Sequence, residues 1–283
     1  MWICSPSQFH ADQIKECAAA GKHVFCEKPI ATDLQGTYEA IAACKTADVK
    51  LMTALQRRFD PHFARVKSAI VNGEVGTPVQ GRLCSRDPAP PPFDYVKGGG
   101  GIFKDMAIHD LDMARFLMGA DPISVMATGS CQINDEILVL DDSAERMDTA
   151  AVLVKFPGDV VVTVEVCRQA PYGYDQRAEV LGTKGMIHTE NLHPTTAKLS
   201  TAAGTGDADL PHDFFMSRYE VAYKDETAAF AKAVFADTAP PVTGDDGLMA
   251  LAIALAAGKS AEENRWVEIS EFVTVKDGSV VPV

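Results

Sequence analysis

The chain has 283 residues, 47% of them hydrophobic and 23% charged, and its formal net charge is −13. This length and composition predict about two globular domains, and the acidic balance argues against nucleic acid or an anionic membrane surface as a partner, because both would repel the chain. The longest apolar run, residues 248–257, is too short to span a bilayer, and no charged-then-apolar leader begins the chain.

The first 56 residues alternate between strand and helix patterns. Short buried strands are predicted at residues 2–4, 24–26 and 50–54, and helices at 11–20 and 34–47. This alternation is typical of β-α-β units with a parallel sheet.

The second predicted strand ends abruptly in a carboxylate, an ammonium and a proline: Glu27, Lys28 and Pro29. Proline ends the strand. Ligands of open α/β sheets bind beyond the carboxyl ends of the strands, so Lys28 is expected to point at a substrate or a cofactor.

From residue 77 onward the pattern changes to longer strands separated by turns, which predicts a second domain built on a mainly antiparallel sheet. A helix at 62–71 precedes this region, and helices at 224–236 and 247–257 follow it. Residues 204–209 are interpreted as a polar loop. The predicted strands cover residues 79–85, 123–131, 148–156, 160–168, 176–182 and 185–188.

A glycine-rich loop, residues 98–101, runs into an amphipathic helical pattern that carries Asp105 and His109. Residues four apart on a helix are neighbours, so Asp105 is expected either to orient the imidazole or to share substrate hydroxyls with it, and the two form a candidate acid/base pair. Two other interpretations compete. Both residues could join Asp110 and Asp112 as metal ligands, but those aspartates lie on other faces and no second cluster supplies more ligands, so no metal is predicted. The helix could also be purely structural, with Asp105 favouring the helix dipole.

The seven cysteines are dispersed along the chain without a Cys-x-x-Cys spacing. Their odd number and dispersal predict reduced thiols in a cytosol-like compartment, so we expect a cytoplasmic protein.

The Glu27-Lys28-Pro29 segment resembles the Glu-Lys-Pro motif of the Gfo/Idh/MocA oxidoreductases, and Asp105 with His109 resembles the Asp-x3-His signature of that family. The surrounding residues 101–117 resemble its inositol 2-dehydrogenase branch in particular. The fold implied by this resemblance is α/β. Residues 1–56 would be the C-terminal remainder of a Rossmann NAD(P)-binding domain, a doubly wound parallel sheet. Residues 57–283 would be an α+β substrate and oligomerisation domain with a large, mainly antiparallel open sheet.

The activity implied by the resemblance is hydride transfer from a secondary alcohol of a polyol or sugar to the nicotinamide of NAD or NADP. His109 would take the hydroxyl proton, Lys28 would stabilise the developing alkoxide, and Asp105 would bind a neighbouring hydroxyl. A homo-oligomer, a dimer or tetramer, is expected because large open sheets usually bury one face against a twin. The implied substrate contacts are Arg57, Asp105, His109, Tyr172 and Tyr174, and the implied cofactor contacts are Ser5, Pro6, His10, Glu27, Lys28 and Pro29.

Weaker interpretations concern the remaining polar residues. Arg86 and Asp87 are further candidates for substrate contacts, and Asp110 either contacts substrate or accepts hydrogen bonds from Arg115. Tyr95 and its neighbours are expected to be solvated loop residues. The five other histidines are interpreted as structural or surface residues: His23, His62, His188, His193 and His212.

The sequence departs from the family pattern in one respect. It contains no Gly-x-Gly-x-x-Gly fingerprint after a strand, which is the backbone cradle for the pyrophosphate. Roughly two to three βα units, about 70 residues at ~30 per unit, are absent compared with the family pattern. The alternative prediction is therefore a truncated, non-catalytic relative that binds a sugar or a protein partner without turning over a cofactor.

Overall fold

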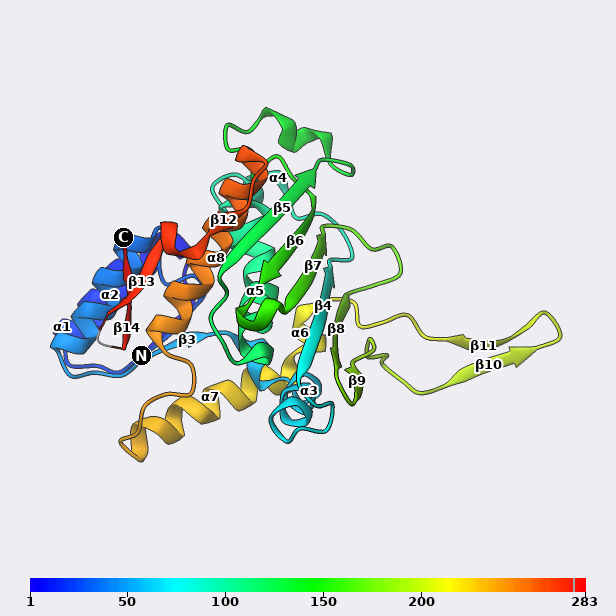
Figure 1. Cartoon of the computed structure of the whole chain (residues 1–283), viewed down its shortest axis with the longest axis horizontal. Coiled ribbons are helices and arrows are strands. Elements are labelled where there is room, and N and C mark those ends of the chain that lie inside the picture. The colour runs from blue at the N-terminus through cyan, green and yellow to red at the C-terminus, as the bar shows by residue number, and fades with distance from the viewer. Residues whose placement is uncertain (277) are drawn as a thin grey trace.

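The computed structural model describes residues 1–276 and 278–283. The chain builds a small parallel sheet followed by a large mixed sheet (Figure 1). This arrangement confirms the predicted fold class.

The small sheet has the order β1-β2-β3, with all strands parallel. It is formed by β1 (Trp2–Ile3), β2 (Val24–Glu27) and β3 (Leu51–Ala54), connected by α1 (His10–Ala19) and α2 (Leu34–Thr46). The side chain of Asp33 caps α2 by accepting a hydrogen bond from the backbone N–H of Gly36, which is the usual role of aspartate at a helix N-cap.

The large sheet has seven strands in the order β12-β5-β6-β7-β4-β8-β9. Neighbouring strands are antiparallel except for β4 and β7, which run parallel. The strand bounds are β4 (Pro78–Arg86), β5 (Ser124–Ser130), β6 (Thr149–Lys155), β7 (Val161–Cys167), β8 (Asp175–Gly182), β9 (Gly185–His188) and β12 (Val267–Glu268).

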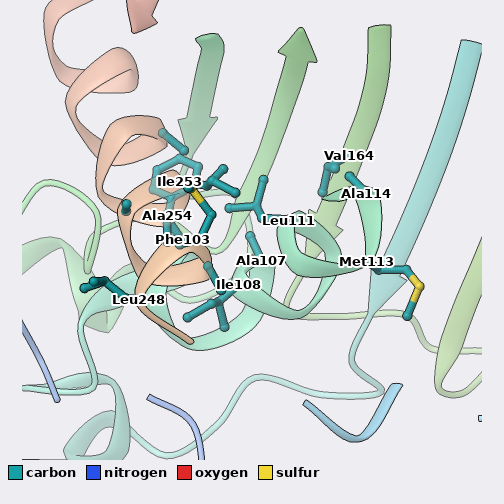
Figure 2. Close-up of a cluster of buried hydrophobic side chains, with 14 of the residues drawn as sticks. Phe103, Ala107, Ile108, Leu111, Met113, Ala114, Val164, Leu248, Ile253 and Ala254 are labelled. Carbon is teal, nitrogen blue, oxygen red and sulfur yellow. The ribbon is translucent and has the colours of Figure 1, made fainter. Parts of the chain in front are cut away.

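Helices α3, α5 and α8 pack against one face of this large sheet. They are α3 (Pro61–Val71), α5 (Ile108–Met118) and α8 (Gly244–Glu263), and a π-helical turn, Phe103–Ala107, leads directly into α5. Figure 2 shows the packing of α5 on α8, with Ile108 and Leu111 facing Leu248 and Ile253. Because α8 is lined by small residues, it also packs closely on α2 and β3 of the small sheet. One continuous hydrophobic core therefore connects the two sheets.

Three further helices and two hairpins complete the regular elements named here. They are α4 (Phe93–Val96), α6 (Phe215–Arg218), α7 (Glu220–Phe235) and the two hairpins β10 (Lys198–Thr201) with β11 (Gly204–Ala208) and β13 (Val273–Lys276) with β14 (Ser279–Pro282). Within the part of the chain that the structure describes, no helix has the length and apolar character needed to cross a bilayer.

Three structural details correct the sequence interpretation. Residues 204–209 are not a loop, because most of them form β11, which pairs with β10. Every residue of this hairpin is exposed, so it has no apolar alternation to signal strands. The strands β12, β13 and β14 were not predicted. Helix α8 is longer than the expected 247–257 at both ends: the Thr243–Asp246 capping box starts it at Gly244, and it continues to Glu263, where Asn264 in the left-handed conformation ends it.

Candidate active site

A cavity of about 1180 Å³ lies where strand ends of both sheets meet. From the small sheet, Cys4 follows β1, Lys28 follows β2 and Arg57 lies just after β3. From the large sheet, Asp87 follows β4 and Arg168 follows β7. The strand-end rule of open α/β sheets therefore holds here, and the cavity is the candidate active site.

Lys28 reaches across the cavity to the second part of the chain. Its Nζ donates to the backbone oxygen of Asp105 at 2.5 Å and to the carboxylate Oδ1 of Asp105 at 3.3 Å. Both side chains are half-buried, so this ion pair is weakly screened by solvent. The interaction brings together two residues that are 77 positions apart in the sequence.

The loop that carries Lys28 is tied to the loop after β1 by the buried imidazole of His10. Nδ1 of His10 lies 2.8 Å from the backbone oxygen of Pro29, and Nε2 lies 2.6 Å from the backbone oxygen of Ser5. His10 thus fixes the relative position of the two strand-end loops. Of the six residues predicted to bind the cofactor, Glu27 and Lys28 line the cavity, whereas Ser5, Pro6 and Pro29 in these two loops and His10 at the start of α1 do not line it.

Asp105 is the best-connected carboxylate of the cavity. In addition to Lys28, it accepts from Nη1 of Arg168 at 2.9 Å and from the hydroxyl of Tyr95 at 3.0 Å. Burial opposes ionisation of Asp105, but the neighbouring cations Lys28 and Arg168 outweigh it and hold the pKa of this carboxyl below its ordinary value. Asp105 is therefore a carboxylate that fixes two cations at the cavity wall.

The predicted orientation of His109 by Asp105 is wrong. Asp105 lies in the π-helical turn and His109 in the first turn of α5, so they do not stack as residues four apart do on a regular α-helix. All the hydrogen bonds of the Asp105 side chain go to other residues in the described part of the chain.

His109 does line the cavity, and its ring nitrogen Nδ1 is buried without a hydrogen-bond partner among the described residues. Burial, together with the positive charges of Lys28 and Arg57, lowers the pKa of His109 well below its usual value. The imidazole is therefore neutral near pH 7 and can accept a proton from a ligand.

Arg57 lines the cavity as predicted, but its guanidinium is already engaged. Its Nη1 donates to Asp110 at 2.9 Å and to Ser85 at 2.8 Å, all within the buried interior. The predicted pairing of Asp110 with Arg115 is wrong, since Arg115 instead pairs with Asp121 and Asp246. The carboxylate of Asp110 is instead occupied by Arg57 and Ser85, which both donate to its Oδ1 in the buried interior.

The two predicted tyrosines have different positions. Tyr174 is buried, lines the cavity and packs edge-on against Phe214 at 5.8 Å between ring centroids. Tyr172 does not appear in the cavity lining; its hydroxyl donates to Asp175 at 2.6 Å and accepts from Arg86 at 2.7 Å.

Some residues that line the cavity were not identified from the sequence as site residues, or were identified only as weaker candidates. Tyr95 is not merely a solvated loop residue, because its hydroxyl reaches Asp105. Arg168 could have been found by the strand-end rule, since it is the last residue of the strand predicted at 160–168 and directly follows β7 in the structure. Asp87, a weaker candidate, does line the cavity, and burial raises the pKa of its carboxyl to about 6. Apolar lining comes from Met106, from the proline-rich loop 88–92 and from residues 214–216.

Beside the cavity, α7 contributes an acid that no sequence pattern indicated. Glu226 is buried, and its Oε2 has no hydrogen-bond partner within the described chain. Burial first, and the charge of Glu27 second, raise the pKa of Glu226 to about 9. Among the described residues, no group of three or more His, Cys, Asp or Glu side chains is arranged to hold a metal ion.

Comparison with known proteins gives a consistent family match over both parts of the chain. Residues 1–55 match the model of an oxidoreductase family with an NAD-binding Rossmann fold, and residues 63–188 match the model of the GFO/IDH/MocA C-terminal domain.

The relatives include proteins named as inositol dehydrogenases. Myo-inositol 2-dehydrogenase of Thermotoga maritima is 43% identical over 96% of this chain and 80% of its own length. The crystal structure of a myo-inositol dehydrogenase from Corynebacterium glutamicum is 37% identical, with a TM-score of 0.88 over 94% of this chain and 79% of that one. The structure of scyllo-inositol dehydrogenase from Lactobacillus casei with bound NAD(H) and scyllo-inositol is 29% identical, with a TM-score of 0.85 over 95% and 79% of the two chains.

Proposed function

We propose that this chain, which belongs to the Gfo/Idh/MocA family of oxidoreductases, is an NAD(P)-dependent dehydrogenase that oxidises a secondary alcohol of a polyol or sugar. The preferred substrate class is that of myo-inositol. The similarity to inositol 2-dehydrogenases at 42–43% identity supports this choice.

The observation that carries the proposal is the convergence of Lys28, Asp105 and His109 on one cavity. The three residues come from the end of β2, from the π-helical turn and from α5. The unpartnered Nδ1 of His109 supports a role toward a ligand, because a buried polar atom without a partner is costly unless something else binds it.

In this proposal the neutral imidazole of His109 accepts the proton of the substrate hydroxyl as the C–H bond breaks. The Lys28 ammonium hydrogen-bonds the same oxygen and stabilises its developing negative charge. Asp105 acts mainly by holding Lys28 and Arg168 in position, and it presents a carboxylate to a neighbouring hydroxyl of the polyol. Arg57 and Tyr174 form the remaining polar wall for the substrate, and Tyr172 contributes only through Arg86 and Asp175.

The cofactor proposed for this site is NAD or NADP. Glu27 and Lys28 would contact its nicotinamide half, together with the loop of Ser5 and Pro6 and the loop residue Pro29, which His10 holds in place. The position of these loops at the carboxyl ends of β1 and β2 supports such a group. When bound, the nicotinamide supplies the carbon that receives the hydride.

Two further assignments complete the proposal. Residues 1–56 form the cofactor part, and residues 57–283 form the substrate and oligomerisation part. A homo-oligomer is expected because the sheet face opposite α5 and α8 carries the exposed apolar residues Leu153 and Leu181 beside an ion pair of Arg82 with Glu165.

The test is isothermal titration of the 283-residue chain with NAD⁺ and NADH, followed by an absorbance assay of NADH formation with myo-inositol. His109→Ala is expected to lower the turnover rate by ~10² to 10⁴ while NADH still binds, because it removes only the proton acceptor. His188→Ala, in an exposed residue of β9, is the matched control. Binding of myo-inositol without NADH formation would instead identify a non-catalytic binding protein.

A further inference from the structure

Residues 88–97, which follow β4 and include α4, form part of the cavity wall through residues 88–92 and Tyr95. Four of these ten residues are prolines, which have no backbone N–H to donate. Apart from short-range bonds to its own and adjacent backbone, the segment makes one hydrogen bond to the rest of the described chain, from the hydroxyl of Tyr95 to Asp105. The segment is therefore weakly tied to the molecule along its length.

Both ends of this segment are anchored. Just before it, the backbone N–H of Asp87 donates to the backbone oxygen of Cys167 at 3.0 Å. Just after it, the Oε1 atom of Glu145 accepts from the backbone N–H groups of Gly98 at 3.0 Å and Gly100 at 3.3 Å. The φ angles of Gly98 and Gly100 are +82° and +85°, in the left-handed region that glycine adopts without strain. These glycines therefore form a hinge between the segment and α5.

The segment packs on a small satellite cluster and not on the main core. Val96 is buried with Ile137 and Leu140 in a hydrophobic cluster that is separate from the core connecting the two sheets. Segments with few long-range hydrogen bonds and little contact with the core are the ones that open at the lowest free energy. Residues 88–97 can therefore open while both sheets stay folded.

We propose that residues 88–97 form a lid over the cavity, and that Tyr95 is a positioning residue that sets the Asp105 carboxylate when the lid is closed. Of the three side chains that bind this carboxylate, Lys28 follows β2 and Arg168 follows β7, so the two sheets hold both of them. Tyr95 instead comes from the four-residue helix α4 and is 56% exposed.

Opening of the lid changes the site at one atom. Oδ1 of Asp105 accepts from the Tyr95 hydroxyl at 3.0 Å and from Nζ of Lys28 at 3.3 Å, whereas Oδ2 accepts from Arg168. With the lid open, Oδ1 keeps Lys28 alone, so the carboxylate is fully held only after closure. The lid itself does not depend on the proposed dehydrogenase activity; its effect on turnover rests on that proposed function.

The first experiment is hydrogen exchange of the whole chain without ligand. All six backbone amides of residues 95–100 are hydrogen-bonded when the lid is closed, so they report its opening. Tyr95→Phe removes the one long-range hydrogen bond, which goes to a charged acceptor, and should speed their exchange by about tenfold. Tyr38→Phe, in α2 and outside the cavity lining, is the matched control and should leave them unchanged. Equal exchange of these amides in the two variants would overturn the lid.

A hinge variant tests the same opening without removing a contact. A Cβ at Gly98 would meet no atom within 4 Å, so Gly98→Ala acts through the positive φ alone and should also speed exchange of residues 95–100 by about tenfold. Gly206→Ala is the matched control, because Gly206 has a φ of +89° and equally open surroundings but lies in β11. Exchange in Gly98→Ala that is no faster than in Gly206→Ala would contradict the hinge.

The positioning role is tested by steady-state kinetics with NAD⁺ and myo-inositol. Tyr95→Phe should lower kcat/KM for myo-inositol by about tenfold and leave the KM for NAD⁺ unchanged, because the proposed cofactor contacts lie in the loops after β1 and β2. Faster exchange with unchanged kcat/KM, or with an equal change of both KM values, would overturn the positioning role. An inactive wild type would overturn the proposed function, while the exchange experiment would still decide the lid.

Discussion

Replacing Arg168 by methionine tests whether the cavity wall is held by charge. The Arg168 and Asp105 side chains are 7% and 13% exposed, and Nη1 of Arg168 lies 2.9 Å from Oδ2 of Asp105. Arg168→Met keeps the length and apolar stem of the side chain but leaves a half-buried carboxylate with one cation fewer. Removing one partner of a buried ion pair lowers the free energy of unfolding by ~3 to 5 kcal/mol. Because Lys28 and Tyr95 still bind Asp105 in the variant, we expect Arg168→Met to lower it by about 2 to 3 kcal/mol.

The assay is urea unfolding of wild type and Arg168→Met across pH, with Arg65→Met as the control. Arg65 forms an ion pair with Glu74 in which both side chains are about half exposed, so solvent screens the pair and its loss should change the unfolding free energy much less than Arg168→Met does. The pKa of Asp105 is lowered in the folded state, so its contribution is fully present above the ordinary carboxyl pKa of about 3.9 and is lost as the pH falls through the lowered folded value. The stability difference between wild type and Arg168→Met should therefore be largest near pH 7 and shrink in acid. A difference no larger than that of the control, or one that grows in acid, would refute this reasoning.

Two other predictions concern the acid beside the cavity and the packing of α8. Burial and the charge of Glu27 raise the pKa of Glu226 to about 9, so the folded protein holds a proton that the unfolded chain releases above about pH 4.3. The folded state of wild type therefore loses stability as the pH rises from about 4.3 toward 9. Glu226→Gln lacks this titration, so its stability relative to wild type should increase by at least about 1 kcal/mol between pH 5 and pH 8, measured by thermal unfolding. A Cβ at Gly247 would lie 2.7 Å from Oγ1 of Thr53, so Gly247→Ala should cost ~1 to 3 kcal/mol through overpacking. Gly258→Ala, in the same helix with its nearest neighbour at 3.9 Å, should instead gain up to about 1 kcal/mol from helix propensity. Equal melting temperatures for the two glycine variants, or a pH-independent gain for Glu226→Gln, would contradict these arguments.

The two segments that carry the candidate site residues could be predicted from the sequence, because each is recognised from neighbouring residues alone. The strand that ends in Glu27-Lys28-Pro29 is recognised from a short apolar run followed by a proline. The helix that carries Asp105 and His109 is recognised from the hydrophobic periodicity of a few neighbouring residues. The same signals predicted the bounds of most strands and helices to within a few residues. The motifs also carried the family resemblance, which the relatives confirm.

The hydrogen-bond partners of the charged side chains could not be predicted from such local patterns. The sequence alone indicated the candidate residues for the chemistry, Lys28, Asp105 and His109, and determined that two kinds of sheet follow one another. Only the tertiary structure decided that Asp105 holds Lys28 and Arg168 instead of His109, and that Asp110 holds Arg57. A charged side chain takes the partner that folding brings within hydrogen-bond distance, and these partners lie 53 to 77 residues away in the chain. That proximity is set by how the two sheets pack through α8, which no local pattern encodes.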